Sequence, residues 1–85
     1  MEIVMIQKKG CMPCKNFAPT IKKYAEDKKI GFKSVQMEDM PENIRPPFYP
    51  YFYLRKNNQI IDKWGGVNER KMEAVIKRNL KKTNL

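Results

Sequence analysis

The sequence contains no histidine, and only 2 of its 85 residues are cysteine. Without an imidazole, the chain lacks the base that Cys–His and Ser–His hydrolases use. Two cysteines are also too few for a structural zinc site, which takes four Cys or His ligands. A secreted miniprotein stabilised by disulfides would carry more cysteines, spread along the chain. These absences leave Cys11 and Cys14 as the main chemical feature of the sequence.

Long apolar runs are missing too, and no stretch approaches the roughly 18 residues that a membrane span needs. The segment 1–7 has no basic residue before its apolar part and no small-residue cleavage site after it. We therefore expect a cytoplasmic protein without a membrane partner. The chain is long enough for a single domain, over residues 1–85, and too short for a second core.

Acidic residues are scarce: 9 Asp and Glu stand against 18 Lys and Arg, which gives a formal net charge of +9. A nucleic-acid surface is one interpretation of this excess. However, the basic residues are scattered, acidic residues lie among them, and no nucleic-acid-binding motif accompanies them. We therefore interpret the charge as a solvated surface that favours acidic partners, and we expect no nucleic-acid binding.

Hydrophobic periodicity predicts an α/β protein with the element order β-α-β-β-β-α. Apolar positions indicate strands at 2–7, 32–38, 51–55 and 59–64, a helix from 11 to about 29, and a second helix after Asn68. The helix between the first two strands predicts that these strands are parallel. Pro19 lies inside the first helix and should kink it. The core face of the last helix is expected to be Met72, Val75, Ile76 and Leu80.

Cys11 and Cys14 form a Cys-x-x-Cys pair at the expected start of a helix, directly after a strand. The helix N-terminus carries a partial positive charge that favours a thiolate over a thiol. Lys8, Lys9 and Lys15 add positive potential in the same direction, so we assign them to tuning the reactivity of Cys11. With two intervening residues, the pair can alternate between dithiol and disulfide. We expect Cys11 to be the exposed nucleophile and Cys14 to be the more buried resolving thiol.

Two other interpretations of the cysteine pair stay open at this stage. The pair could be half of a metal or iron–sulfur site that a second chain completes, or it could be two unreactive thiols. In the second case the chain would be a binding or adaptor module that holds a partner on its basic, aromatic surface.

Four features at mutually consistent spacings resemble the thioredoxin/glutaredoxin superfamily. Cys11-Met12-Pro13-Cys14 matches its redox motif, and Pro19 matches the helix-kinking proline of thioredoxins. Tyr49-Pro50 resembles the family's cis-proline, and Gly66 lies where thioredoxins carry a glycine beside the substrate groove. The resemblance implies a thioredoxin fold with a four-stranded mixed sheet in the order 2-1-3-4. It also implies that substrate binds at Met12, Pro13, Tyr49, Pro50, Gly65 and Gly66.

The sequence also departs from the thioredoxin pattern. Met5 stands where thioredoxins bury an aspartate below the disulfide, so another group must take the proton of Cys14. The first strand–helix unit of thioredoxins is missing, which makes this a glutaredoxin-sized version. The Thr-Val-Pro of glutaredoxins is absent, and Gly65-Gly66 lies too far beyond Pro50 to match their glutathione-binding glycines without a gap. Trp64 is either a groove residue or a core aromatic.

Together, these observations predict a thiol–disulfide oxidoreductase that acts on protein disulfides. We expect it to be a monomer whose redox centre is the Cys11–Cys14 disulfide, with no metal and no other cofactor. Its partners would be a protein substrate and an electron-donating reductase. Glutathione is the alternative donor, as in a glutaredoxin-type enzyme.

Overall fold

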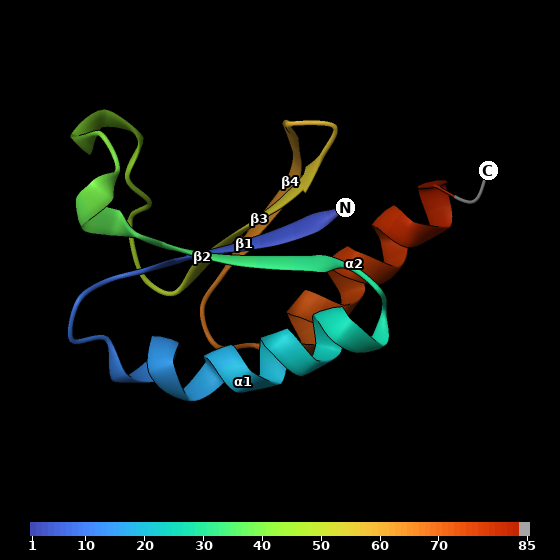
Figure 1. The fold of residues 1–85 in the computed structure, drawn as a ribbon, viewed down its shortest axis with the longest axis horizontal. Coiled ribbons are helices and arrows are strands. Elements are labelled where there is room, and N and C mark those ends of the chain that lie inside the picture. Colours follow the sequence, from blue (N-terminus) through green and yellow to red (C-terminus); the bar gives the residue numbers. More distant parts are fainter. Residues whose placement is uncertain (84–85) are drawn as a thin grey trace.

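The computed structural model describes residues 1–83. Its element order is β-α-β-β-β-α, as predicted (Figure 1). The elements are β1 (Glu2–Gln7), α1 (Met12–Asp27), β2 (Gly31–Gln36), β3 (Tyr51–Lys56), β4 (Gln59–Gly65) and α2 (Glu69–Thr83). Two short 3₁₀ turns, Met37–Asp39 and Glu42–Ile44, lie between β2 and β3. Within the described residues, no helix is long and apolar enough to cross a membrane.

The four strands form one mixed sheet in the order β2-β1-β3-β4, which confirms the predicted topology. β1 pairs with β2 in parallel because α1 carries the chain back across the sheet. β3 is antiparallel to both β1 and β4. The β3–β4 turn is built by Asn57 and Asn58, which have φ values of 53° and 65°. Asparagine tolerates this left-handed region, which tight hairpin turns require.

Both helices cover the same face of the sheet (Figure 1). The core lies between that face and the helices, and it joins residues of β1, β3 and β4 to residues of α1 and α2. Its buried members include Ile3, Met5, Phe17, Ile21, Phe52, Leu54, Trp64, Met72 and Ile76. Val4 and Ile6 point to the opposite face and are nevertheless buried, at 5% and 2% exposure. β1 is therefore buried on both faces, which explains its nearly continuous apolar sequence.

The structure corrects several predicted boundaries. β2 ends at Gln36, and not at residue 38, because the chain turns into the 3₁₀ segment Met37–Asp39. α1 ends at Asp27, and Lys29, with a φ of 58°, takes the left-handed position that often terminates a helix.

In α2, Asn68 caps the helix as predicted, since its Oδ1 accepts the N–H of Lys71 at 3.0 Å. The predicted core face is confirmed, since Met72, Val75 and Ile76 are buried and the half-buried Leu80 packs against the core. Asn79, which the sequence did not single out, is buried as well.

The register of the sheet brings the loop after β1 close to the start of β3, because Ile6 pairs with Tyr51. Residues 8–11 and residues 49–50 therefore lie at the same end of the sheet, together with the segment that follows β2 (Figure 1). A hydrogen bond joins two of these loops: the backbone N–H of Lys9 donates to the carboxylate of Glu38 at 3.0 Å.

Candidate active site

Cys11 and Cys14 are joined by a disulfide at the N-terminus of α1, with their Cα atoms 5.3 Å apart. Cys11 is the N-cap residue, in an extended conformation, and its own N–H donates to the carbonyl of Lys8 at 3.0 Å. The N–H of Cys14 donates to Sγ of Cys11 at 3.2 Å. Pro13 fits the first turn of the helix, where a backbone N–H has no intrahelical acceptor. The helix start thus directs an otherwise unpaired N–H toward the sulfur of Cys11.

The two sulfur-bearing residues differ in exposure. Cys14 has no exposed surface, because it lies on the face of α1 that packs against the sheet. Cys11 is half-buried, and the neighbouring Met12 is 58% exposed. Cys11 is therefore the more accessible of the two cysteines, which is the order of exposure that the sequence predicted.

The peptide bond between Tyr49 and Pro50 is cis, which confirms the expectation from the sequence. Pro50 is buried, and its carbonyl accepts the N–H of Gly66 at 2.8 Å. Gly66 has a φ of 86°, a conformation that side chains other than glycine rarely adopt. This backbone hydrogen bond places Pro50 and Gly66 in direct contact.

Gly65 has a different local environment from Gly66. A Cβ at position 65 would collide with the ring of Phe48 and would approach Cδ1 of Tyr51 to 2.8 Å. Phe48 and Tyr51 pack edge to face, with ring centroids 5.5 Å apart. The ring of Phe48 thus occupies the space that a side chain at position 65 would need, which explains why this residue is glycine.

Two pockets flank the Cys-x-x-Cys segment, and Met12 lines both of them. One has a volume of about 500 Å³ and includes Cys11 together with Lys8, Lys9 and Lys15 in its wall. The other has a volume of about 520 Å³ and is lined by Met12, Pro13, Asn16, Phe17 and Val67. The site therefore has a basic side and a mainly apolar side.

Trp64 and Tyr49, the aromatic residues that the sequence offered for the groove, have different environments. Trp64 is 2% exposed and stacks on Phe52, with centroids 5.0 Å apart, so the groove interpretation of Trp64 is wrong and the core interpretation holds. Tyr49 is half-buried and lies near Tyr53. Burial, followed by the neighbouring Tyr51 and Tyr49, raises the pKa of Tyr53.

Met5 is 1% exposed and belongs to the hydrophobic core. Of the side chains that the structure describes, only Asn79 is both buried and polar or charged. Asn79 donates to Asp62 on β4 at 2.8 Å and lies in the second half of α2. Among the described residues, no buried carboxylate therefore replaces the aspartate that the family resemblance led us to expect at the position of Met5.

The sequence did not single out three contributors to the site: Val67 and Asn16 in the apolar pocket, and Glu38 beside Lys9. Val67 is 55% exposed. An apolar residue directly after Gly65-Gly66 was the available signal for it. Glu38 gave no signal, because its contact with Lys9 depends on how the two loops meet.

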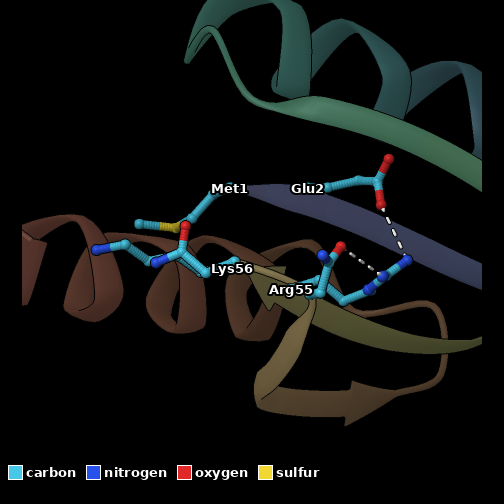
Figure 2. A pocket seen from close by; sticks show the side chains of 6 residues that line it. Met1, Glu2, Arg55 and Lys56 are labelled. Atoms are coloured by element: carbon cyan, nitrogen blue, oxygen red, sulfur yellow. Dashed lines mark hydrogen bonds and ion pairs between the residues drawn. The ribbon is translucent and has the colours of Figure 1, made fainter.

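A further pocket, of about 230 Å³, lies at the other end of β1 and β3 (Figure 2). Glu2 and Arg55 point toward one another across it and form an ion pair at 3.4 Å. Arg55 also donates to Oδ1 of Asn58. The residues that line this pocket include no cysteine. Across residues 1–83, no cluster of three or more His, Cys, Asp or Glu side chains is arranged to hold a metal ion.

Comparisons with known proteins agree with this geometry. Residues 3–78 match the thioredoxin family model. A search among curated proteins by sequence gives no match. Among solved structures, thioredoxin 1 from Thermosipho africanus is 18% identical, with a TM-score of 0.85 and 100% of each chain covered. A thioredoxin from Schistosoma mansoni is 28% identical, with a TM-score of 0.78 over 91% of this chain and 76% of that one.

A third similar structure is a complex of ferredoxin:thioredoxin reductase with thioredoxin f2. The matched chain of this complex is 18% identical to the present chain, with a TM-score of 0.80 over 92% of this chain and 76% of that one. The family match extends over most of the sequence, and the fold, the disulfide and the cis-proline occur together in the structure. The chain belongs to the thioredoxin family.

Proposed function

We propose that this chain is a thiol–disulfide oxidoreductase that reduces disulfides in proteins. The observation that carries the proposal is the asymmetry of the Cys11–Cys14 disulfide. Cys11 reaches the surface in the wall of the basic pocket, and Cys14 is completely buried. Such a pair can form a bond to a substrate through one sulfur and release it through the other.

In the first step, the thiolate of Cys11 attacks one sulfur of the substrate disulfide. A bond forms between Cys11 and that sulfur as the substrate S–S bond breaks. The other substrate sulfur leaves as a thiolate and takes a proton from water. The N–H of Cys14 points at Sγ of Cys11, and the positive end of α1 lies beside it, so both favour the charged form of the nucleophile.

In the second step, Cys14 loses its proton and its Sγ attacks Cys11. The Cys11–Cys14 bond forms, the bond to the substrate breaks, and the second substrate thiolate leaves and is protonated. The dithiol of the protein has then given two electrons to the substrate, which becomes two thiols. Because Met5 is apolar, we propose that water, or the first substrate thiolate released, accepts the proton of Cys14.

Each turnover leaves the Cys11–Cys14 disulfide, which a reductant must open. We propose that a dithiol-bearing reductase does so, attacking the accessible Cys11. The complex of a thioredoxin f2 with its reductase shows that a related fold docks on such a partner. Recharging by a reductase dithiol and recharging by glutathione can be measured separately, and faster recharging by glutathione would overturn this choice of donor.

The experiment compares insulin reduction by the wild-type protein with that by Cys11→Ser, Cys14→Ser and the double variant, with a dithiol as electron source. We expect Cys11→Ser and the double variant to be inactive, and we expect Cys14→Ser to accumulate a mixed disulfide that mass spectrometry detects. Wild-type turnover by Cys11→Ser would contradict the assignment. An inactive wild-type protein whose double variant still binds its partner would instead support the adaptor interpretation.

A further inference from the structure

The basic pocket beside Cys11 offers a binding surface in addition to the positive potential that its lysines place near the sulfur. Three lysines line it: Lys8 and Lys9 from the loop after β1, and Lys15 from the first turns of α1. Gln7 and Gln36 are its other polar side chains, and no acidic residue lines it. Its volume of about 500 Å³ is large enough for an amino-acid side chain together with part of its backbone.

These lysines have no acidic partner within residues 1–83. The ion pairs of the described chain join Arg45 to Glu42, Arg55 to Glu2 and Arg78 to Asp62. The carboxylate of Glu38 accepts the backbone N–H of Lys9 at 3.0 Å and, within the described residues, forms no ion pair with a lysine ammonium group. The three ammonium groups therefore leave positive charge that nothing in the described chain neutralises directly.

The two pockets beside the Cys-x-x-Cys segment differ in charge. Met12 separates the basic pocket from the apolar pocket, whose wall includes Phe17 and Val67 and contains no charged residue. A substrate segment placed over Cys11 would thus meet cations on one side and apolar surface on the other. Charge complementarity then decides which residue beside the substrate cystine is favoured.

Resting on the proposed function, we propose that the pocket of Lys8, Lys9 and Lys15 binds an acidic side chain next to the disulfide under attack. The substrates preferred by this protein are therefore polypeptides with Asp or Glu near the reactive cystine. The attraction raises the rate of encounter and holds the substrate sulfur near Cys11, while the electron transfer itself is the exchange described above.

The test uses peptides with one internal disulfide that differ only in one flanking residue, which is Glu, Gln or Lys. Each of these three residues is placed either before or after the reactive cysteine, which gives two sets of three peptides. The pre-reduced protein is mixed with each peptide, and the second-order rate of reduction is measured. At 10 mM salt we expect the Glu peptide, in at least one order, to react about tenfold faster than the Gln peptide, and the Lys peptide to react slowest. At 1 M salt, where the Debye length is about 3 Å, the preference should disappear.

Two variants that lose the same charge distinguish the effect of the pocket lysines on the preference from the effect of net charge. Lys8→Gln/Lys9→Gln/Lys15→Gln should lose the preference for the Glu peptide. Lys22→Gln/Lys23→Gln/Lys77→Gln, which changes exposed lysines outside the pocket, should retain it. The ratio of two peptides within one variant cancels any change in the reactivity of Cys11.

Equal rates for the Glu and Gln peptides with the wild-type protein would overturn this inference and leave the proposed function intact. A control variant that loses the preference as fully as the pocket variant would also overturn it, because net charge alone would then explain the selectivity. If the wild-type protein reduces none of the peptides, the proposed function fails and this inference fails with it.

Discussion

The ring of Phe48 occupies the place where a side chain at position 65 would lie, so Gly65 is the residue that allows Phe48 to pack on the sheet. This contact links the loop before the cis-proline to the last residue of β4. Phe48 is 50% exposed, so its ring has room to move toward solvent. Such a movement would break the contact between the ring and Tyr51.

Gly65→Ala should therefore lower the free energy of unfolding by about 1–3 kcal/mol, the usual cost of overpacking. The measurement is urea unfolding followed by the fluorescence of Trp64, the one tryptophan in the sequence. In a Phe48→Ala background the same change should cost less by at least about 0.5 kcal/mol, because the two residues contact each other. Additive effects of the two substitutions would contradict the contact.

Val67 should act on substrate and not on stability, because it is 55% exposed and lines the apolar pocket. Val67→Ser should reduce kcat/KM for a peptide with a Leu beside its cystine by about threefold to tenfold, the value of a lost apolar contact. Its free energy of unfolding should change by less than about 0.5 kcal/mol. An unchanged kcat/KM would show that substrate does not contact this side of Met12.

Asp62 makes the fold sensitive to acid. Burial raises the pKa of Asp62, but hydrogen bonds from Asn79, Arg78 and the N–H of Lys63, together with the charge of Arg78, outweigh burial and lower it below 3.8. Because the folded-state pKa lies below the unfolded one, this stabilisation is complete above the unfolded value and is lost as the pH falls through the folded value.

As the pH falls below about 4, the wild-type protein should therefore lose about 0.5–1.5 kcal/mol more stability than Asp62→Asn. Urea unfolding at a series of pH values measures the difference. Asp39→Asn, at an exposed position, is the matched control and should follow the wild-type curve. Parallel curves for the wild-type protein and Asp62→Asn would contradict the role of Asp62.

The hydroxyl of Tyr24 is buried and has no hydrogen-bond partner among the described residues. Burial first, and Glu73 second, raise the pKa of Tyr24. Removing an unpaired buried hydroxyl relieves a desolvation cost, so Tyr24→Phe should leave the free energy of unfolding unchanged or raise it by up to about 1 kcal/mol. A loss of more than about 1 kcal/mol in urea unfolding would show that the hydroxyl has a partner.

The fold followed from the sequence because local patterns determine most of it. The apolar strand 2–7, the amphipathic helix from Cys11 and the Asn57-Asn58 turn each have a strong signal, and the crossover fixes the parallel pair. Boundaries were less predictable. The residues after Gln36 have a strand-like pattern, but they form the 3₁₀ segment Met37–Asp39. In this segment the carboxylate of Glu38 accepts the N–H of Lys9, a tertiary contact that the local pattern does not show.

The cysteine pair and the cis-proline were also predictable, from spacing and from family resemblance. The division of the site into a basic side and an apolar side was not predictable. The basic and apolar pockets depend on how the loops and α1 are arranged on the two sides of Met12. Residues such as Val67 and Glu38 become part of the site through tertiary contacts. Asn79 was missed because its burial depends on a partner, Asp62, that lies on a different element.

The central claim is that the thiol of Cys11, and not that of Cys14, reacts with substrate. Alkylation of the reduced wild-type protein with iodoacetamide at pH 7, resolved by residue with mass spectrometry, tests it most directly. We expect Cys11 to be modified at least about ten times faster than Cys14, because only Cys11 is both accessible and beside positive charge. Equal, slow modification of both thiols would contradict the account.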